Sequence, residues 1–275
     1  MDFGLDVAQH QLSWEEIRRR VRFAEDAGFA GVWLFDHFTA LYGDPEGPCL
    51  EGWTLLAALA AATERVRLGT LVTGITYRHP SVLAAQAITV DHASGGRLDL
   101  GLGAAWHARE HRALGIAFPS TRQRVERLEE AVEVIRLLMT TDGATYDGRH
   151  YGLQDATYRP RPVQRPHPPL WIGAGGPRRT LPLAARVADV WHTFGDPAAL
   201  ARKSRIVDEH AQRAGRDPAS IRRSTNVSLS QPIAAIRRDV EQRAELGFDY
   251  LIASWPEQGQ ERVECFMEEV AGPLA

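Results

Sequence analysis

Lysine is almost absent from this chain, which carries a single lysine in 275 residues. That residue, Lys203, falls in a predicted helix that begins after Asp196 and Pro197, away from the ends of the predicted strands. Aldolases that form Schiff bases and enzymes that use pyridoxal phosphate need a lysine amine at the reacting centre. The expected position of Lys203 therefore excludes both classes of enzyme.

Cysteine is scarce, and long apolar runs are missing. Cys49 and Cys265 fit no metal-binding or redox spacing, and we interpret them as free thiols in a reducing compartment. The longest apolar run, residues 55–62, is too short to cross a membrane. Residues 1–10 lack the basic segment and apolar core of an export signal. These absences predict a cytoplasmic protein that does not bind membranes.

A large net charge is also missing. The net charge is −3, and the arginines are spread along the chain rather than gathered in one patch, so nucleic acid is not an expected partner. The chain contains neither the GxSxG pattern of serine hydrolases nor the phosphate-binding loop of P-loop enzymes. A small-molecule substrate is the expected partner.

Strand patterns alternate with helical patterns along the chain. Strands are predicted at residues 3–7, 31–35, 66–72, 97–102, 170–174, 189–193, 224–230 and 250–254, each followed by a helix. The second of them, GVWLF, is apolar throughout, which is typical of a parallel strand covered on both faces. Eight such units predict an α/β protein with a (β/α)8 TIM barrel.

One segment breaks this alternation. Residues 140–169 contain TTDG, YDGRHYG and PRPVQRPHPP, which predict a small hairpin followed by an extended proline-rich stretch. We interpret the segment as an insertion after the fourth strand that could cover the barrel mouth, within one domain spanning residues 1–275.

The carboxyl ends of the barrel strands predict where a site lies. Asp36 and His37 follow the second strand, and a carboxylate beside an imidazole can anchor a ligand and exchange a proton near neutral pH. We expect this pair to be catalytic; the alternative is a helix cap beside a structural histidine.

Two glycine-rich turns lie at other strand ends. Gly101 and Gly103 end the fourth strand in RLDLGLGAAWHAREH, where a backbone without Cβ atoms lets a ligand lie on the main chain. Gly173, Ala174, Gly175 and Gly176 lead into a helix near Arg179, an arrangement that suits a phosphate group. A plain tight turn is the alternative for the second segment.

Two motif matches point to other chemistry. GLGAAW begins like a dinucleotide-binding fingerprint, but it lacks the third glycine and the following strand. His107, Glu110 and His111 match the HxxEH pattern of one class of zinc peptidases. No third ligand is evident, so no metal is predicted and the peptidase stays an alternative.

Several long segments resemble the luciferase-like monooxygenase superfamily, and within it the deazaflavin-dependent oxidoreductases. They are GFAGVWLFDHF (28–38), EGWTLLAALAAATERVRLGTLVTGITYRHP (51–80), SGGRLDLGLGAAWHAREHRALGI (94–116), RPVQRPHPPLWIGAGGPRRTL (161–181) and ADVW (188–191). The similarity runs from Phe3 to Trp191, so the last two strands depend on periodicity alone.

This resemblance implies a cofactor and its contacts. The cofactor of this branch is coenzyme F-420, an 8-hydroxy-5-deazaflavin, whereas other relatives use FMN. The segment after the third strand forms a bulge in relatives, often with a non-prolyl cis peptide, and the second glycine loop meets the cofactor phosphate. The expected cofactor contacts are Asp36, Leu71, Val72, Thr73, Gly74, Gly103, Ala104, Trp106, His107, Gly173, Ala174, Gly175, Gly176 and Arg179.

The resulting hypothesis is hydride transfer between reduced coenzyme F-420 and a small organic substrate, with His37 as proton donor or acceptor. An FMN-dependent monooxygenase and a flavin-binding protein without turnover are alternatives on the same barrel. Sugar-phosphate dehydrogenases of the superfamily carry a tryptophan and a glutamate where this chain has Leu41 and Trp106–His107, which argues against a sugar phosphate. His192 stands where asparagine is common in relatives, and its role is open. The resemblance also implies a homodimer, since members of the superfamily often dimerise.

Overall fold

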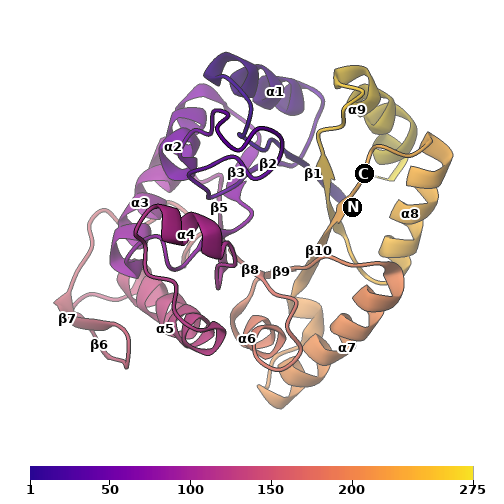
Figure 1. The fold of residues 1–275 in the computed structure, drawn as a ribbon. Helices are drawn as coiled ribbons and strands as arrows, with labels where there is room; N and C mark the ends of the chain where they lie inside the picture. Colours follow the sequence, from indigo (N-terminus) through magenta and orange to yellow (C-terminus); the bar gives the residue numbers. More distant parts are fainter. Residues whose placement is uncertain (275) are drawn as a thin grey trace.

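The computed structural model describes residues 1–274, which form a closed parallel barrel surrounded by helices (Figure 1). The barrel strands are β1 (Asp2–Asp6), β2 (Gly31–Leu34), β3 (Arg67–Thr70), β5 (Leu98–Gly103), β8 (Leu170–Gly173), β9 (Val190–His192), β10 (Arg222–Val227) and β11 (Tyr250–Ser254). β1 pairs with β11, and β3 pairs with both β2 and β5, so the sheet closes on itself. The predicted TIM barrel is confirmed.

Helices cover the outside of the barrel (Figure 1). They are α1 (Trp14–Asp26), α2 (Gly52–Ala62), α3 (Pro80–Ala93), α4 (Ala108–Ala113), α5 (Thr121–Thr140), α6 (Thr180–Val187), α7 (Pro197–Arg213), α8 (Ile233–Glu245) and α9 (Gln260–Phe266). Side-chain caps fix several starts: Ser13 accepts a hydrogen bond from the Glu16 amide, and Asp196 from the Ala199 amide. Across residues 1–274, no helix combines the length and the hydropathy that a membrane crossing needs.

An aromatic layer crosses the barrel interior, with the Arg67–Asp99 ion pair towards the amino ends of the strands. A cluster of Trp33, Trp171 and Tyr250 fills the lower part, and the two indole rings lie 4.2 Å apart. Ile252 belongs to this cluster, and its register partners Gly4 and Asn226 share its face of the sheet. Asn226 therefore faces the barrel interior next to this cluster.

The third strand is shorter than predicted because it is interrupted. β3 ends at Thr70, the peptide bond between Leu71 and Val72 is cis, and pairing with β5 resumes at β4 (Thr73–Gly74). The Val72 side chain fills the space that Cβ atoms would need at Gly103 and Gly173, 2.6 and 2.8 Å from its Cγ2 atom. These two glycines make room for the Val72 side chain, while both still line the main cavity, so their contact with a ligand stays a prediction.

The insertion lies on the outside of the barrel. Its hairpin, β6 (Ala144–Asp147) and β7 (Gly152–Ala156), packs beside α5 (Figure 1), where the Glu130 carboxylate accepts hydrogen bonds from the amides of residues 149–151. Gln164, in the proline-rich stretch, binds Asp91 and the Leu98 carbonyl near the amino end of β5. The idea that this segment covers the mouth is wrong, since none of residues 140–169 lines the mouth cavity.

The seventh strand also differs from its prediction. β10 spans Arg222–Val227, so it begins two residues earlier and ends before Ser228 and Ser230. Those two serines lie in an exposed turn, where the Ser228 hydroxyl donates to the Ser230 hydroxyl at 3.3 Å. In this turn both hydroxyl groups are exposed to solvent, whereas a position within a barrel strand would bury them.

Candidate active site

A cavity of about 580 Å³ opens at the carboxyl ends of the strands. The predicted site residues that line it are Asp36, His37, Leu71, Val72, Gly74, Gly103, Ala104, Trp106, Gly173, Ala174, Gly175 and Gly176. They come from four strand ends that are distant in the sequence, and the barrel brings them together. We call this space the main cavity.

Three predicted residues lie outside that lining. Thr73 is buried, and its hydroxyl accepts a hydrogen bond from the Trp53 indole at 2.9 Å. The His107 ring stacks on Trp106 with centroids 4.9 Å apart, and its Nδ1 atom lies 4.0 Å from Glu110. The Arg179 side chain is half exposed, 4.0 Å from Glu126.

Asp36 is held by an arginine. Its Oδ2 atom accepts a hydrogen bond of 2.7 Å from Arg78, which also bonds to Glu51. Burial raises the pKa of the Asp36 carboxyl, and the charge of Arg78 opposes that rise. The Oδ1 atom of Asp36 has no hydrogen-bond partner within residues 1–274, and the Asp36 side chain is fully buried behind the cavity wall.

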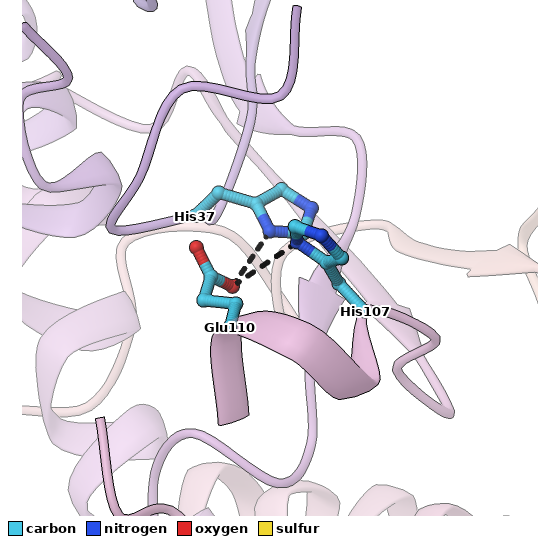
Figure 2. A group of neighbouring side chains, drawn as sticks. All are labelled: His37, His107 and Glu110. Atoms are coloured by element: carbon cyan, nitrogen blue, oxygen red, sulfur yellow. Dashed lines mark hydrogen bonds and ion pairs between the residues drawn. The ribbon is translucent and has the colours of Figure 1, made fainter. Parts of the chain in front are cut away.

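His37 is paired with Glu110, which lies 73 residues further along the chain (Figure 2). The distance from His37 Nδ1 to Glu110 Oε2 is 2.9 Å. The other oxygen, Oε1, accepts from the Phe38 amide at 2.8 Å and from the Thr39 amide and hydroxyl, each at 3.0 Å. The Tyr77 hydroxyl also donates to Glu110.

These bonds determine which nitrogen of His37 carries a proton. Burial alone would raise the pKa of Glu110, but hydrogen bonds from His37, Tyr77 and the Phe38 amide hold it well below its usual range. An ionised carboxylate has no proton to donate, so His37 Nδ1 must be the donor. Nε2, which makes no hydrogen bond in the described part of the chain, is left to exchange a proton with a ligand.

The HxxEH pattern does not form a peptidase site. His111 uses both ring nitrogens, Nδ1 with the His107 carbonyl at 2.8 Å and Nε2 with the Thr76 hydroxyl at 2.7 Å. The side chains that could share a metal are instead His37, His107 and Glu110, with ligand atoms within 4.8 Å of one another (Figure 2). Glu110 already accepts bonds from His37 and Tyr77, which a metal would have to displace.

Sequence reasoning missed the role of Glu110 and its neighbours. The motif search did select Glu110, but as the base of a zinc site, because its real partner is distant in the sequence. Tyr77 and Arg78 occur in the TYRHP segment after the third strand, and no local pattern marked them. Their polarity within an otherwise apolar connection was the available signal.

The opposite end of the main cavity carries the glycine loop and the single lysine. Lys203 lines the cavity, and its Nζ donates to the Phe194 carbonyl at 2.6 Å and to Thr193 Oγ1 at 3.1 Å. A Cβ atom built on Gly175 would lie 3.5 Å from that nitrogen. The sequence argument that placed Lys203 away from the strand ends is wrong, because its long side chain extends from α7 back to the rim.

A second space adjoins the main cavity on the side of β1, β10 and β11. It measures about 400 Å³ and shares Phe35, Tyr42, Leu71 and Phe194 with the main cavity. Asp6, Asn226, Ser254 and Trp255 complete much of its wall. We call it the side lobe.

The family model for luciferase-like monooxygenases matches residues 1–264. The chain belongs to this family. The luciferase-like fold is also seen in a solved structure of a coenzyme F-420-dependent secondary alcohol dehydrogenase in complex with an F-420-acetone adduct, which has a TM-score of 0.89 at 20% identity and covers 98% of each chain.

Luciferase-like relatives with described activities differ in cofactor. A coenzyme F-420-dependent glucose-6-phosphate dehydrogenase of Microbacterium testaceum is 35% identical over 219 residues, 78% of this chain and 63% of that protein. An FMNH2-dependent dimethylsulfone monooxygenase of Pseudomonas putida is 30% identical over 254 residues, 91% of this chain and 67% of that protein. The match to the first spans less than two thirds of its length.

Proposed function

We propose that this protein transfers a hydride between coenzyme F-420 and a small organic substrate, with His37 as the residue that exchanges the proton. The observation that carries the proposal is the Glu110–His37 pair, which presents Nε2 beside a cavity bounded at its other end by a glycine loop and a lysine. Relatives named as coenzyme F-420-dependent dehydrogenases support the choice of cofactor.

The main cavity suits such a cofactor at both ends. Leu71, Val72 and Ala104 line the cavity and offer an apolar surface for a flat ring. The backbone amide of Gly175 and the Lys203 ammonium offer an anion site for a phosphate group, next to the Gly176 amide, which donates to Thr180 Oγ1 at 2.9 Å. Coenzyme F-420 supplies hydride chemistry when bound, and the protein supplies position and a proton.

His37 moves the proton in this scheme. Because Nδ1 is held as a donor to Glu110, a neutral ring accepts a proton at Nε2 and a charged ring returns it there. Glu110 stabilises the charged form without itself becoming protonated, since several donors hold its carboxylate ionised.

An FMN-dependent monooxygenase is the second candidate, favoured by the dimethylsulfone monooxygenase relative. Titration of the cofactor-free protein with coenzyme F-420 and, separately, with FMN distinguishes the two, followed by the absorbance and fluorescence of each cofactor. We expect micromolar affinity for coenzyme F-420 and much weaker affinity for FMN. The opposite order would select the monooxygenase and contradict the proposal.

Three earlier expectations stay predictions: a cytoplasmic location, a homodimer and a single domain.

The peptidase alternative is tested by titrating the cofactor-free protein with zinc. Stoichiometric zinc binding that is lost in His107→Ala would revive a metal site. We expect the coenzyme F-420 affinity to be unaffected by a chelator.

A further inference from the structure

Three polar side chains at the floor of the barrel mouth have atoms without partners. They are Oδ1 of Asp6, Oδ1 of Asn226 and Nε2 of His192, all buried within residues 1–274. His192 lies within reach of Asn226, which favours its charged form. The Asp6 oxygen has no such neighbour, and because buried polar atoms in proteins are nearly always hydrogen-bonded, it calls for a ligand. Asp6 and His192 are 7% and 2% exposed, which leaves little water to satisfy them.

The barrel places these three residues on one surface. Gly4 and Asn226 are both register partners of Ile252 in the barrel interior, and Asp6 follows Gly4 by two residues on the same face of β1. Asp6 and Asn226 line the side lobe, whereas His192 lines the main cavity. The unpartnered atoms therefore border the region where the two spaces meet.

The remainder of the side lobe is mostly apolar. Its wall includes Ala8, Leu12, Leu71 and Trp255. Because Leu71 also borders the main cavity, a molecule in the side lobe lies against the surface proposed for the cofactor ring. A substrate held there has a direct approach to that ring.

The charges around the side lobe disfavour an anion. In the described lining its one arginine, Arg20, is bonded to Glu16 at 2.7 Å and stacks on Trp255 at 4.4 Å, so it offers no free cation. Burial raises the pKa of Asp6 to about 7, and burial lowers the pKa of His10 in the same wall. Near neutral pH a large share of the Asp6 carboxyl groups is protonated and can donate a hydrogen bond.

We infer that the side lobe is part of the substrate site and takes the end of an uncharged, largely apolar molecule that carries a hydroxyl or carbonyl group, bound by Asp6 and Asn226. The inference rests on the proposed function, which places the reacting group of that molecule beside His37 in the main cavity. It goes further by naming the class of substrate and by excluding a phosphorylated sugar from this chain's site.

The test measures binding of cyclohexanol and cyclohexanone, with glucose 6-phosphate as the charged comparator. Saturation-transfer NMR follows each probe on the protein loaded with oxidised coenzyme F-420 and on the cofactor-free protein. The variants are Asp6→Leu, Asp6→Asn and Asn226→Leu, with Asp147→Leu in the exposed hairpin as the matched control. The melting temperature of every variant is recorded in parallel.

We expect the neutral probes to bind and glucose 6-phosphate not to bind. Asp6→Leu and Asn226→Leu should each weaken neutral-probe binding by about fivefold or more, the size of one lost hydrogen bond. Asp6→Asn should stay within about twofold, because its amide keeps a donor and an acceptor. Asp6→Leu should also raise the melting temperature by about 2–4 °C, since it removes an unsatisfied buried group.

Two outcomes would overturn the inference: unchanged cyclohexanol binding in Asp6→Leu, or glucose 6-phosphate binding as tightly as the neutral probes. Failure of both neutral probes to bind the loaded protein also counts against it. These results are separable from the cofactor proposal, which fails if coenzyme F-420 does not bind the parent protein. Measurement on the cofactor-free protein tests the side lobe even in that case.

Discussion

Two sides of the barrel mouth differ in how their polar atoms are satisfied. On the side of β2 and α4, Glu110 accepts hydrogen bonds from His37, Tyr77, Phe38 and Thr39, and the network holds the imidazole in one orientation. On the side of β1 and β10, buried atoms of Asp6 and Asn226 have no partner in the described residues.

This difference separates two tasks. A saturated network fixes a reacting group before the substrate arrives, and that preorganisation favours proton transfer. An unsatisfied surface gains its hydrogen bonds only when a ligand enters, and that gain favours recognition. We therefore expect changes on the Glu110 side to affect turnover and changes on the Asp6 side to affect substrate binding.

Replacement of His37 should have the largest effect. His37→Gln removes the group that exchanges a proton at Nε2, and turnover with coenzyme F-420 should fall on the order of 10³-fold, within the range of general acid–base catalysis. Stopped-flow measurement of hydride transfer checks this, and the dissociation constant of coenzyme F-420 should stay within about threefold. A variant that binds the cofactor and turns over at the parent rate would remove His37 from the mechanism.

Replacement of its partner should have the next largest effect. Glu110→Gln keeps the shape but presents an amide to Nδ1, which frees the ring to adopt the other tautomer; a loss on the order of 10²-fold in turnover is expected. Glu126→Gln, on α5 outside the network, is the control; equal losses in both variants would point to a general structural effect.

Removal of the lysine charge should weaken cofactor binding alone. Lys203→Met should raise the dissociation constant of coenzyme F-420 about tenfold, the size of one charge-assisted hydrogen bond at a partly exposed site. The affinity for the analogue without the phosphate should not change. Arg205→Met, exposed on the same helix, serves as control. Equal loss of affinity for both forms of the cofactor would contradict a phosphate role.

The smallest effect concerns stability and pH. The pKa of Asp6 is raised by burial to about 7, so between pH 4 and 7 the folded state binds more protons than the unfolded state. The protonated Asp6 carboxyl stabilises the folded state at low pH, and this contribution is lost as the pH rises through 7. Between pH 6 and 7 the loss lowers the free energy of unfolding by roughly 1 kcal/mol. Urea unfolding of Asp6→Asn should lack this fall. His192 acts in the opposite direction, because burial lowers its pKa to about 3 and its unfolded imidazole still binds protons between pH 6 and 7. Asp6→Asn keeps this His192 contribution, so the difference between parent and variant isolates Asp6.

Most of the fold was predictable because it depends on repeated local patterns. Apolar runs such as GVWLF and the cap at Ser13 identify strands and helix starts from neighbouring residues alone. The break after Thr70 was expected only through family resemblance, since no propensity within the segment requires it. The position of the hairpin depends on Glu130, a partner on another element, and so the sequence pattern missed it.

The candidate site was predictable in outline but not in its bonding. Strand ends identify Asp36 and His37, because the barrel fixes where those ends meet. The partner of His37 and the reach of Lys203 are set by side chains that meet across the barrel mouth, which no spacing rule contains. The absence of partners for Asp6 is likewise a property of the assembled interior.

Val72 packs against the glycines at positions 103 and 173, so three segments that are distant in the sequence meet at one side chain. A methyl group added at either glycine fits only if position 72 carries a residue smaller than valine. A larger residue at either glycine therefore requires a second substitution at Val72. Efforts to enlarge a residue at either glycine should vary position 72 at the same time, because single additions there meet Val72 Cγ2.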